Sequence, residues 1–270
     1  MRAAIVDCHC HLLPEIDDGP GSLRDALKLA SLAVEEGITD AICTPHVVPG
    51  VYNNTTEAVR IAVAAFQCEL SRAAIPLTLH TGAEIRITGD VETRLKRGEI
   101  PTLAEGRYVL LEPPADVRLP RLDAYFGALI EAGYLPIVAH PERLLWAGRH
   151  IEEIIGYVGL GAHLQVTAGS LVGFFGREAL RLARWLLETG AVGLIASDAH
   201  HASRRPHLLG DARRLVEALV GWREAERIFV ANPQAVLAGH PLVLSDQGGR
   251  RPLNKFRFST QFIRPIEVAR

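Results

Sequence analysis

The sequence lacks any long uninterrupted run of apolar residues. No stretch approaches the ~18 apolar residues that a membrane-spanning helix needs. The first ten residues, MRAAIVDCHC, do not contain the extended apolar core of a secretory signal peptide. The chain also lacks a strong charge of either sign, since its formal net charge is −2, and no overall field attracts nucleic acid. We therefore expect a cytoplasmic protein that neither spans a membrane nor binds nucleic acid.

Cysteine is scarce as well. The four cysteines are Cys8, Cys10, Cys43 and Cys68, and in a cytoplasmic protein we expect them to stay reduced. The first two alternate with histidines in DCHCH, and successive side chains of a strand point to opposite faces. This alternation argues against a mixed Cys/His zinc site, although both residue types bind zinc well. We expect Cys8 and Cys10 to pack in the apolar core.

The 270 residues are enough for one large domain with a core of its own. Hydrophobic residues make up 48% and charged residues 22%, which is typical of a soluble globular protein. We predict one domain over residues 1–240 and a basic C-terminal tail over residues 241–270. Between residues 250 and 270 this tail carries six basic residues against the single acid Glu267. Such a tail is either solvated and loosely docked, or it contacts an acidic partner or a membrane surface.

One unit recurs three times along the chain. A helix-like segment ends in Glu-x-Gly, an apolar strand follows, and a residue of a metal-ligand type stands at the far end of the strand. Glycine there suits the left-handed residue that closes a helix, and short apolar runs bounded in this way are typical of buried parallel strands. The glycines of the three units are Gly37, Gly133 and Gly190, and the units lead to His46, to His140, and to Asp198 with His200.

The wider pattern predicts an α/β protein built around a parallel sheet. We expect seven strands, mostly separated by helical segments, at 4–12, 38–45, 77–84, 108–112, 134–139, 162–167 and 191–197. Ser22 and Asp25 have the spacing of a capping box, which predicts the start of a helix. Seven such units could close into a barrel, and the active sites of (β/α) barrels lie where the strands end.

Nine side chains of metal-ligand types lie at these strand ends or close to them. His9 and His11 share one face of the first strand, with Asp7 beside them, and Asp18 follows in an Asp-Asp-Gly segment. We predict that the metal ligands are four carboxylates and five imidazoles, namely His9, His11, Asp18, His46, Glu84, Glu112, His140, Asp198 and His200.

Divalent cations account for this inventory. Four neighbouring carboxylates would repel one another, and their pKa values would shift strongly if no cation were present. A mixed histidine and carboxylate set suits manganese, iron or zinc better than calcium, and nine ligands are too many for one ion but enough for two or three. Metal ions about 3.5–4 Å apart can activate a hydroxide and hold the oxygens of an in-line displacement, so the pattern indicates a metal-dependent phosphoesterase.

Two arginines favour a phosphate ester as the substrate. Arg143 lies in His-Pro-Glu-Arg just past a strand end, and Arg205 follows the last predicted ligand by five residues. Guanidinium groups bind phosphate oxygens through paired donors, so we assign both to phosphate contact and prefer Arg205 to its neighbour Arg204. Gln165 and Ser170 end another strand at the same edge, where they either line the pocket or cap the next helix.

The remaining histidines are not assigned to the metal site. We expect His80 and His163 to be core or supporting residues, and His201 to be a neighbour of the site rather than a member. The last three, His150, His207 and His240, are expected at the surface.

These segments resemble the PHP (polymerase and histidinol phosphatase) superfamily and, more closely, the bacterial capsule-type, manganese-dependent protein-tyrosine phosphatases. The matching segments are DCHCHLLPEIDDGPGS, TPH, GAE, LLE, IVAHPER, QVTAGSLVGFFG and SDAH followed by RP, in family order between roughly residues 5 and 210. DxHxH is shared across the superfamily, whereas the stretch from LLP to DDGP, HPER and QVTAGS are much more specific to the tyrosine phosphatase branch. The pair Pro113-Pro114 after Glu112 departs from the family pattern.

The resemblance implies a distorted (β/α)7 barrel of the PHP fold, similar to a TIM barrel, with three divalent ions. Manganese is the implied metal, with iron or zinc as alternatives. The implied ligands are His9, His11, Glu84 and Asp198 for one ion, Glu84, Glu112 and His140 for a second, and Asp18, His46 and His200 for a third. Arg143 and Arg205 correspond to the phosphate-contacting arginines of the family.

The implied activity is removal of phosphate from tyrosines of a protein, which in this family is a membrane-associated tyrosine kinase that regulates capsule or exopolysaccharide synthesis. The loop of the cysteine-dependent phosphatases, a cysteine followed after five residues by arginine, is absent at all four cysteines. Two alternatives stay open. One is a small-molecule PHP phosphatase such as histidinol-phosphatase, and the other is a non-catalytic regulator that keeps the metal site for structure or partner binding.

Overall fold

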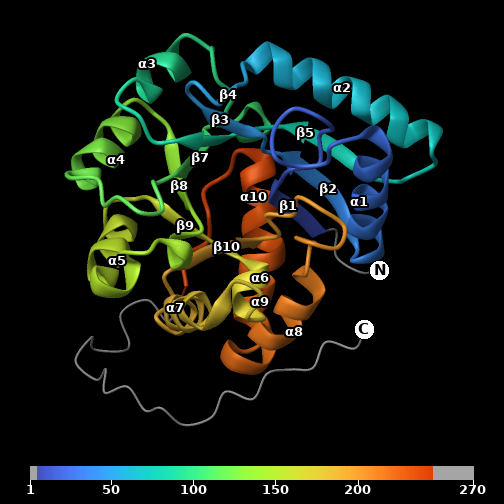
Figure 1. Cartoon of the computed structure of the whole chain (residues 1–270). Helices are drawn as coiled ribbons and strands as arrows, with labels where there is room; N and C mark the ends of the chain where they lie inside the picture. Colours follow the sequence, from blue (N-terminus) through green and yellow to red (C-terminus); the bar gives the residue numbers. More distant parts are fainter. Residues whose placement is uncertain (1–4, 246–270) are drawn as a thin grey trace.

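The structure is a computed structural model that describes residues 5–245 (Figure 1). Within this range the chain is a mixed α/β protein, as the alternation of apolar runs and helical segments predicts. The basic residues 250–270 of the predicted tail lie outside the described residues, so the boundary at residue 240 stays a prediction.

The strands form two sheets. The smaller sheet pairs β1 (Ile5–Cys10) with β2 (Ile38–Cys43) and β2 with β5 (Thr78–Thr81), all in parallel. The larger sheet is parallel except for its last pair, which is antiparallel. Its order is β10 (Val192–Ala196), β9 (His163–Thr167), β8 (Leu135–Ala139), β7 (Tyr108–Glu112), β6 (Glu84–Arg86), β3 (His46–Val48) and β4 (Tyr52–Asn53).

The two sheets meet in a ring like that of a distorted barrel. The amide of Asp198, just past β10, donates to the carbonyl of His9 in β1 at 2.7 Å, and the amide of His11 donates to the carbonyl of Ala199 at 2.8 Å. On the other side of the ring, β5 of the small sheet leads after two residues into β6 of the large one. This TIM-barrel-like arrangement brings the ends of β1 and β10 together, and these ends carry several of the predicted ligands.

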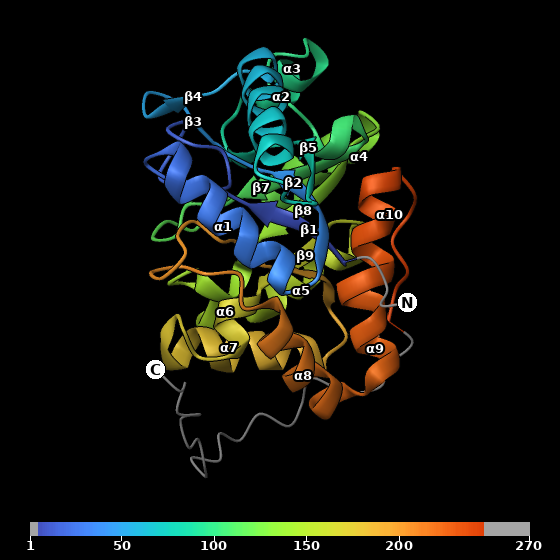
Figure 2. The same ribbon diagram turned by 90° about the vertical axis from the view of Figure 1, so that its right-hand side faces the viewer.

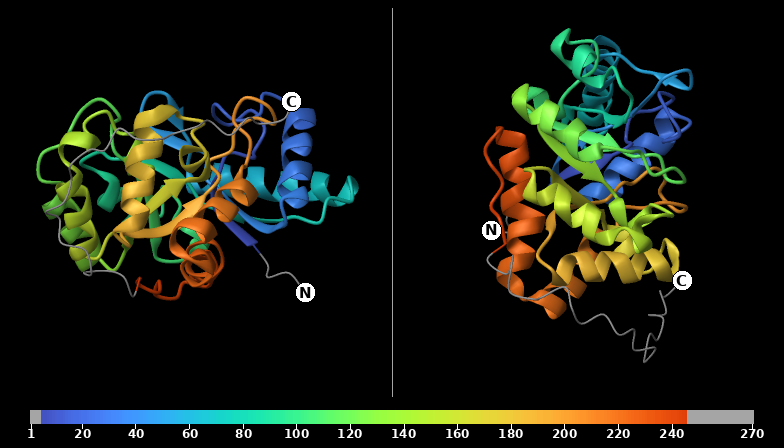
Figure 3. Two further views of the ribbon diagram at one scale, coloured as in Figure 1. Left: turned by 90° about the horizontal axis from the view of Figure 1, so that it is seen from below. Right: turned by 90° about the vertical axis from the view of Figure 1, so that its left-hand side faces the viewer.

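Helices surround the strands (Figures 2 and 3). The α-helices are α1 (Leu23–Glu35), α2 (Thr56–Arg72), α3 (Val91–Lys96), α4 (Leu122–Glu131), α5 (Ile151–Gly159), α6 (Ala168–Leu171), α7 (Gly176–Glu188), α8 (Leu209–Val220), α9 (Trp222–Glu226) and α10 (Asn232–Ala238). Short turns lie at Leu103–Glu105, Pro141–Arg143 and Ala147–Arg149, and a π-helical turn at Arg227–Ala231 joins α9 to α10.

The helix ends have the chemistry that their sequences predict. Ser22 caps α1, because its hydroxyl oxygen accepts a hydrogen bond from the amide of Asp25 at 3.2 Å. The three glycines of the recurring unit, Gly37, Gly133 and Gly190, all have positive φ after the end of a helix. Each of these helices is thereby stopped directly before a strand.

Most of the predicted strands are present, but one prediction was wrong. The segment 77–84 is not a single strand: it is divided into β5 and β6, which belong to different sheets. The division falls at Gly82, where a Cβ atom would lie 2.7 Å from the Ile42 Cγ2 atom of β2. The short strands β3 and β4 were not predicted at all, and they form a hairpin that carries His46.

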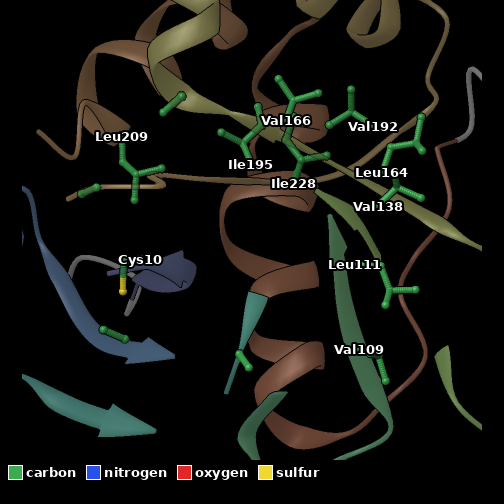
Figure 4. Packing of buried hydrophobic residues seen from close by; sticks show 14 of the residues in the cluster. Cys10, Val109, Leu111, Val138, Leu164, Val166, Val192, Ile195, Leu209 and Ile228 are labelled. Carbon is green, nitrogen blue, oxygen red and sulfur yellow. The ribbon is translucent and has the colours of Figure 1, made fainter. Parts of the chain in front are cut away.

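The apolar core lies between the strands and their helices. Figure 4 shows part of it, where Val166, Val192 and Ile195 of β9 and β10 gather around Ile228. Cys8 and Cys10 are both fully buried in apolar clusters, as predicted. A smaller apolar cluster, which includes Tyr108, Leu194 and Val236, lies where α10 packs against the strands. The Tyr108 hydroxyl donates to the His240 carbonyl at 2.7 Å and ties β7 to the residues after α10. The opposite end of the barrel is left for polar residues.

Candidate metal centre

The nine predicted ligands converge at the polar end of the barrel. Glu112 ends β7, His140 follows β8, and Asp198 follows β10, as expected for side chains at the carboxyl ends of strands. His46 and Glu84 reach the same place differently, because each is the first residue of a short strand that starts just after another strand has ended. Eight of the nine are buried or nearly so, and only the side chain of Asp18 is substantially exposed, at 47%.

Three overlapping groups of these side chains have ligand atoms within 4.8 Å of one another. The first is fully buried and contains His9, His11, Glu84 and Asp198. Here the His9 Nε2 atom lies 3.3 Å from both Glu84 Oε2 and Asp198 Oδ1. The His11 Nε2 atom lies 3.4 Å from the same Glu84 oxygen. This group has the same members as the ligand set implied for the first ion.

The second group contains His11, Asp18, His46 and His200. The Asp18 Oδ1 atom lies 3.3 Å from the Nε2 atoms of both His46 and His200. Three of these residues were expected together, and the structure adds His11, whose ring stacks on that of His200 with centroids 3.7 Å apart.

The third group contains His46, Glu84 and Glu112. His140, which was expected beside Glu84 and Glu112, contacts Glu84 through its Nε2 atom at 2.7 Å. Glu84 is therefore a member of two groups and also a neighbour of His140, so its carboxylate lies at the centre of the whole cluster.

The unsatisfied atoms of the cluster fit bound cations. Glu84 Oε2, Asp198 Oδ1 and His46 Nδ1 are buried, and none has a hydrogen-bond partner among residues 5–245. Yet each carboxylate oxygen lies 3.1–3.7 Å from several imidazole nitrogens. A buried acceptor that faces imidazole lone pairs is costly on its own, whereas a divalent ion between them is a favourable partner for both.

Charges within the cluster shift its pKa values. Burial, reinforced by Arg143, lowers the pKa of His140 to about 4, and burial with the nearby His11 lowers that of His200 to about 4. Both imidazoles are thus neutral, which is the form that binds metal ions. Burial opposes ionisation of Asp198, but His9 and the two arginines outweigh it and hold its pKa well below the usual range.

His11 has the opposite shift. Burial disfavours its protonation, but the carboxylates of Asp17 and Glu84 outweigh this effect and raise its pKa to about 10. A metal ion bound at His11 must displace that proton.

Two supporting residues hold the histidines in place. Asp17, which was not among the predicted ligands, accepts from His11 Nδ1 at 2.6 Å and from the backbone amide of His46 at 3.1 Å. Gln165 lines the site: its Oε1 atom lies 2.9 Å from the Nδ1 atom of His9. Such contacts orient the imidazoles, as outer partners of metal ligands commonly do. Asp17 was missed because a loop sequence has no periodicity that shows which side chain supports a histidine.

Both predicted phosphate-binding arginines reach the cluster. Arg143 Nη1 and Arg205 Nη2 each donate to the Asp198 Oδ2 atom. Both guanidinium groups also lie over the ring of Phe175, with their Cζ atoms 4.3 and 5.6 Å from its centroid. The ring rests against Gly169, where a Cβ atom would lie 2.9 Å from Phe175 Cε2. Stacking uses the face of a guanidinium and leaves its in-plane donors free.

A buried carboxyl group fixes the turn that carries Arg143. Glu142 Oε1 accepts from the backbone amide of Thr167 at 3.0 Å and from the hydroxyl of Ser170 at 2.7 Å. Ser170 therefore contacts Glu142, and through it helps to hold the turn that carries Arg143. Burial raises the pKa of Glu142 to about 7. On the other side of the cluster, Arg86 pairs with Glu112 at 3.0 Å, and neither Arg86 nor Glu142 was singled out in the sequence.

The other histidines mostly lie where they were expected, with one exception. His80 pairs with Asp40 at 3.0 Å, away from the cluster, and His240 is exposed. The prediction that His207 lies at the surface was wrong, because this side chain is 1% exposed. Its Nδ1 atom lies 3.3 Å from the hydroxyl of Ser197, which in turn donates to Asp7. This network ties the loop after β10 to β1.

Comparison with known proteins gives a consistent result. A family model described as "Capsular polysaccharide synthesis, CpsB/CapC" matches residues 5–238. The tyrosine-protein phosphatase YwqE of Bacillus subtilis (strain 168) is 38% identical over 222 residues, which are 80% of this chain and 85% of that protein. The tyrosine-protein phosphatase CpsB of Streptococcus pneumoniae is 26% identical over 238 residues, which are 86% of this chain and 98% of that protein.

A solved structure agrees in fold as well. It comes from work on YwqE of Bacillus subtilis and CpsB of Streptococcus pneumoniae, described as unique metal-dependent tyrosine phosphatases. It superposes with a TM-score of 0.86 at 34% sequence identity and covers 89% of this chain and 97% of the other. In the part of the chain described here, residues 5–245, no helix has both the length and the apolar character to cross a membrane.

Proposed function

This chain belongs to the CpsB/CapC family of capsular polysaccharide synthesis, and from that premise we propose that it is a metal-dependent protein-tyrosine phosphatase. The observation that carries the proposal is the cluster around Glu84. Three overlapping groups of histidines and carboxylates lie beside two arginines, so cation-binding and phosphate-binding chemistry meet at one point.

We assign three divalent ions to the cluster. His9, His11, Glu84 and Asp198 hold the first; Glu84, Glu112 and His140 hold the second; Asp18, His46 and His200 hold the third. Manganese is the proposed metal, with iron or zinc as alternatives, because mixed nitrogen and oxygen ligands accept all three. When bound, these ions activate water and neutralise the charge on the phosphoryl oxygens.

The protein's own side chains bind and orient the phosphate. Arg143 and Arg205 present donors at the edge of the cluster, and an incoming phosphate competes with Asp198 for these donors. Their positive charges also stabilise the negative charge that builds on the phosphoryl oxygens during in-line attack. Phe175 and the Glu142 carboxyl group restrict the two arginines, so little ordering remains to be done when the substrate binds.

We assign the substrate to phosphotyrosine on a protein, most specifically the tail of a membrane-associated tyrosine kinase that regulates capsule or exopolysaccharide synthesis. The enzyme itself is assigned to the cytoplasm. The proposed chemistry uses no cysteine nucleophile: Cys8, Cys10 and Cys43 are buried, and burial raises the pKa of the Cys8 and Cys10 thiols well above the usual value. The exposed Cys68 lies on α2 and belongs to none of the three ligand groups.

A substrate comparison tests this proposal. Protein loaded with manganese is assayed with a phosphotyrosine peptide, with histidinol phosphate and with para-nitrophenyl phosphate, before and after chelation of the metal. We expect metal-dependent turnover and a clear preference for the peptide over histidinol phosphate. Preference for histidinol phosphate would favour a small-molecule phosphatase. Absence of hydrolysis of all three compounds at several pH values would instead favour a non-catalytic regulator.

A further inference from the structure

A cavity of about 500 Å³ opens directly beside Arg143. It is bounded by the loop that follows Arg143 and by the start of α7, and its lining includes Arg143, Leu144, Leu145, Arg149, Phe175 and Ala179. Two of these residues, Arg143 and Phe175, also border the metal centre. The cavity and the metal centre are therefore neighbours that share a wall.

This shared wall sets what can reach the cavity. A phosphotyrosine whose phosphate is held at Arg143 carries its polypeptide chain past the rim of the site. Each further residue of an extended chain advances by ~3.3–3.6 Å, so the residues next to the phosphotyrosine are within reach of the cavity. A small ester such as para-nitrophenyl phosphate has no such flanking residues.

The chemistry of the lining is partly apolar and partly cationic. The side chain of Leu145 is 82% exposed and offers apolar surface at the edge of the cavity. Arg149 is exposed and makes no ion pair with any residue between 5 and 245. Two acidic residues also line the cavity: Glu178 pairs with Arg181, and the buried Glu142 accepts hydrogen bonds from Thr167 and Ser170. Since Arg143 pairs with Asp198, the exposed charge of the lining that has no ion-pair partner among the described residues is that of Arg149.

The wall that carries Leu145 is fixed in place before any ligand binds. The Leu145 amide donates to the Ala115 carbonyl at 2.8 Å, and the Trp146 indole nitrogen donates to the Pro114 carbonyl at 3.4 Å. Both acceptors lie in the loop after Glu112, which begins with the proline pair. A surface held in this way loses little conformational freedom on binding.

We propose that this cavity binds the polypeptide segment next to the phosphotyrosine, with an acidic side chain paired to Arg149 and apolar atoms against Leu145. The inference rests on the proposed phosphatase function and adds to it a preference for acidic residues beside the phosphotyrosine. The charge of Arg149 also attracts such a segment during encounter.

The test compares Arg149→Glu with the wild-type protein on three substrates. These are a phosphotyrosine peptide with flanking aspartates, the same peptide with asparagines in their place, and para-nitrophenyl phosphate. We expect Arg149→Glu to lower kcat/KM for the acidic peptide roughly five- to tenfold, mainly through KM, as loss and reversal of a rim charge pair would do. Turnover of para-nitrophenyl phosphate should stay near the wild-type value.

Two further variants sharpen the result. Leu145→Ser should lower kcat/KM for both peptides but leave turnover of para-nitrophenyl phosphate unchanged. Arg107→Ala removes another exposed arginine, located before β7 at the opposite end of that strand from Glu112, and should behave as wild type. The proposal is contradicted if Arg149→Glu changes kcat/KM equally for the two peptides, or if it lowers kcat/KM for all three substrates together. Failure of the wild-type protein to hydrolyse any phosphotyrosine substrate would reject the proposed function itself.

Discussion

Asp198 is the residue at which the two halves of the centre meet. Its Oδ1 atom faces the imidazoles of the first group, and its Oδ2 atom accepts from both arginines. One carboxylate can thus hold a cation on one side and phosphate-binding donors on the other. This division of roles predicts that the arginines and the metal ligands can be separated by mutation.

The first prediction separates Arg205 from its neighbour. Arg205→Ala should lower kcat/KM for a phosphotyrosine peptide by ~10²–10³, the usual loss when one donor to a developing oxyanion is removed. Its metal content should stay near normal because the ligands are intact. Arg204→Ala is the matched control, since Arg204 is exposed, and it should retain activity. A fully active Arg205→Ala protein would contradict the phosphate role.

The second prediction concerns the aromatic ring under both guanidinium groups. Phe175→Leu keeps an apolar side chain but removes the π face, so the inhibition constant for inorganic phosphate should rise several-fold, in line with ~0.5–1 kcal/mol for each partly exposed cation–π contact. Phe175→Tyr should restore tight binding. Phe174→Leu alters the exposed neighbouring ring and should have little effect. Equal phosphate inhibition of Phe175→Leu and wild type would show that the stacking is incidental.

For individual residues, the sequence predicted which side chains gather at the site better than which residues support them. It predicted the nine side chains that converge and the two arginines beside them, because all but Asp18 lie in a predicted strand or shortly after one, and Asp18 lies in the Asp-Asp-Gly segment after the first strand. It predicted Asp18 as a ligand but gave no role to the adjacent Asp17, because nothing in the loop sequence indicates the contact between Asp17 and His11. The sequence also placed His207 at the surface, because nothing near this residue in the chain indicates that its ring contacts Ser197 and the Leu29 carbonyl.

Among the secondary-structure elements, α1 illustrates how local sequence chemistry fixes a boundary. We predict that Ser22→Ala lowers the free energy of unfolding by about 1 kcal/mol, because it removes the acceptor for the Asp25 amide. Urea unfolding followed by circular dichroism measures this loss. Ser22→Thr keeps the capping hydroxyl, which accepts from the Asp25 amide and donates to the Asp25 carboxylate, and should remain close to wild type. If the alanine and threonine variants were equally stable, the cap would contribute nothing.

The strands β5 and β6 show where the sequence pattern is not sufficient to predict an element. The strand pattern over 77–84 is continuous, but Gly82 packs so closely against Ile42 that the chain turns there and passes from one sheet to the other. That contact joins residues forty positions apart and leaves no local signal. The hairpin of β3 and β4 did have one, because Pro49 and Gly50 separate two short β-prone segments.

For the molecule as a whole, a half-buried histidine at the start of β9, His163, predicts part of the pH dependence of stability. Burial, with a contribution from Arg227, lowers the pKa of His163 to about 4 from an ordinary 6.5. The folded state favours the neutral form, so this histidine stabilises the fold above pH 6.5. That stabilisation, on the order of 3 kcal/mol at most, is lost as the pH falls from about 6.5 through about 4.

The corresponding experiment measures the free energy of unfolding of metal-free protein between pH 4 and 8. His163→Gln should show a shallower decline toward low pH than wild type, because glutamine does not titrate. His240→Gln changes an exposed histidine and should follow the wild-type curve. Parallel curves for wild type and His163→Gln would contradict this account.

The α/β architecture and its barrel-like closure follow from the sequence because the recurring unit of helix, glycine and apolar strand is repeated around the ring. What brings nine distant side chains together is the closure itself, in which β10 returns to β1. The metal centre is thus a property of the whole chain rather than of any one segment. Glu84 is its centre: like His11 and His46 it belongs to two of the three ligand groups, and its carboxylate also contacts His140.

The most direct test is therefore the number of manganese ions bound per chain, measured by elemental analysis after loading and gel filtration. Wild-type protein should retain more than one ion. Glu84→Gln preserves the shape of the side chain but removes its charge, and it should lose more than one ion, whereas Arg107→Ala should bind as wild type does. The account is contradicted if the wild-type chain holds one ion or none, or if Glu84→Gln binds as much manganese as the wild type.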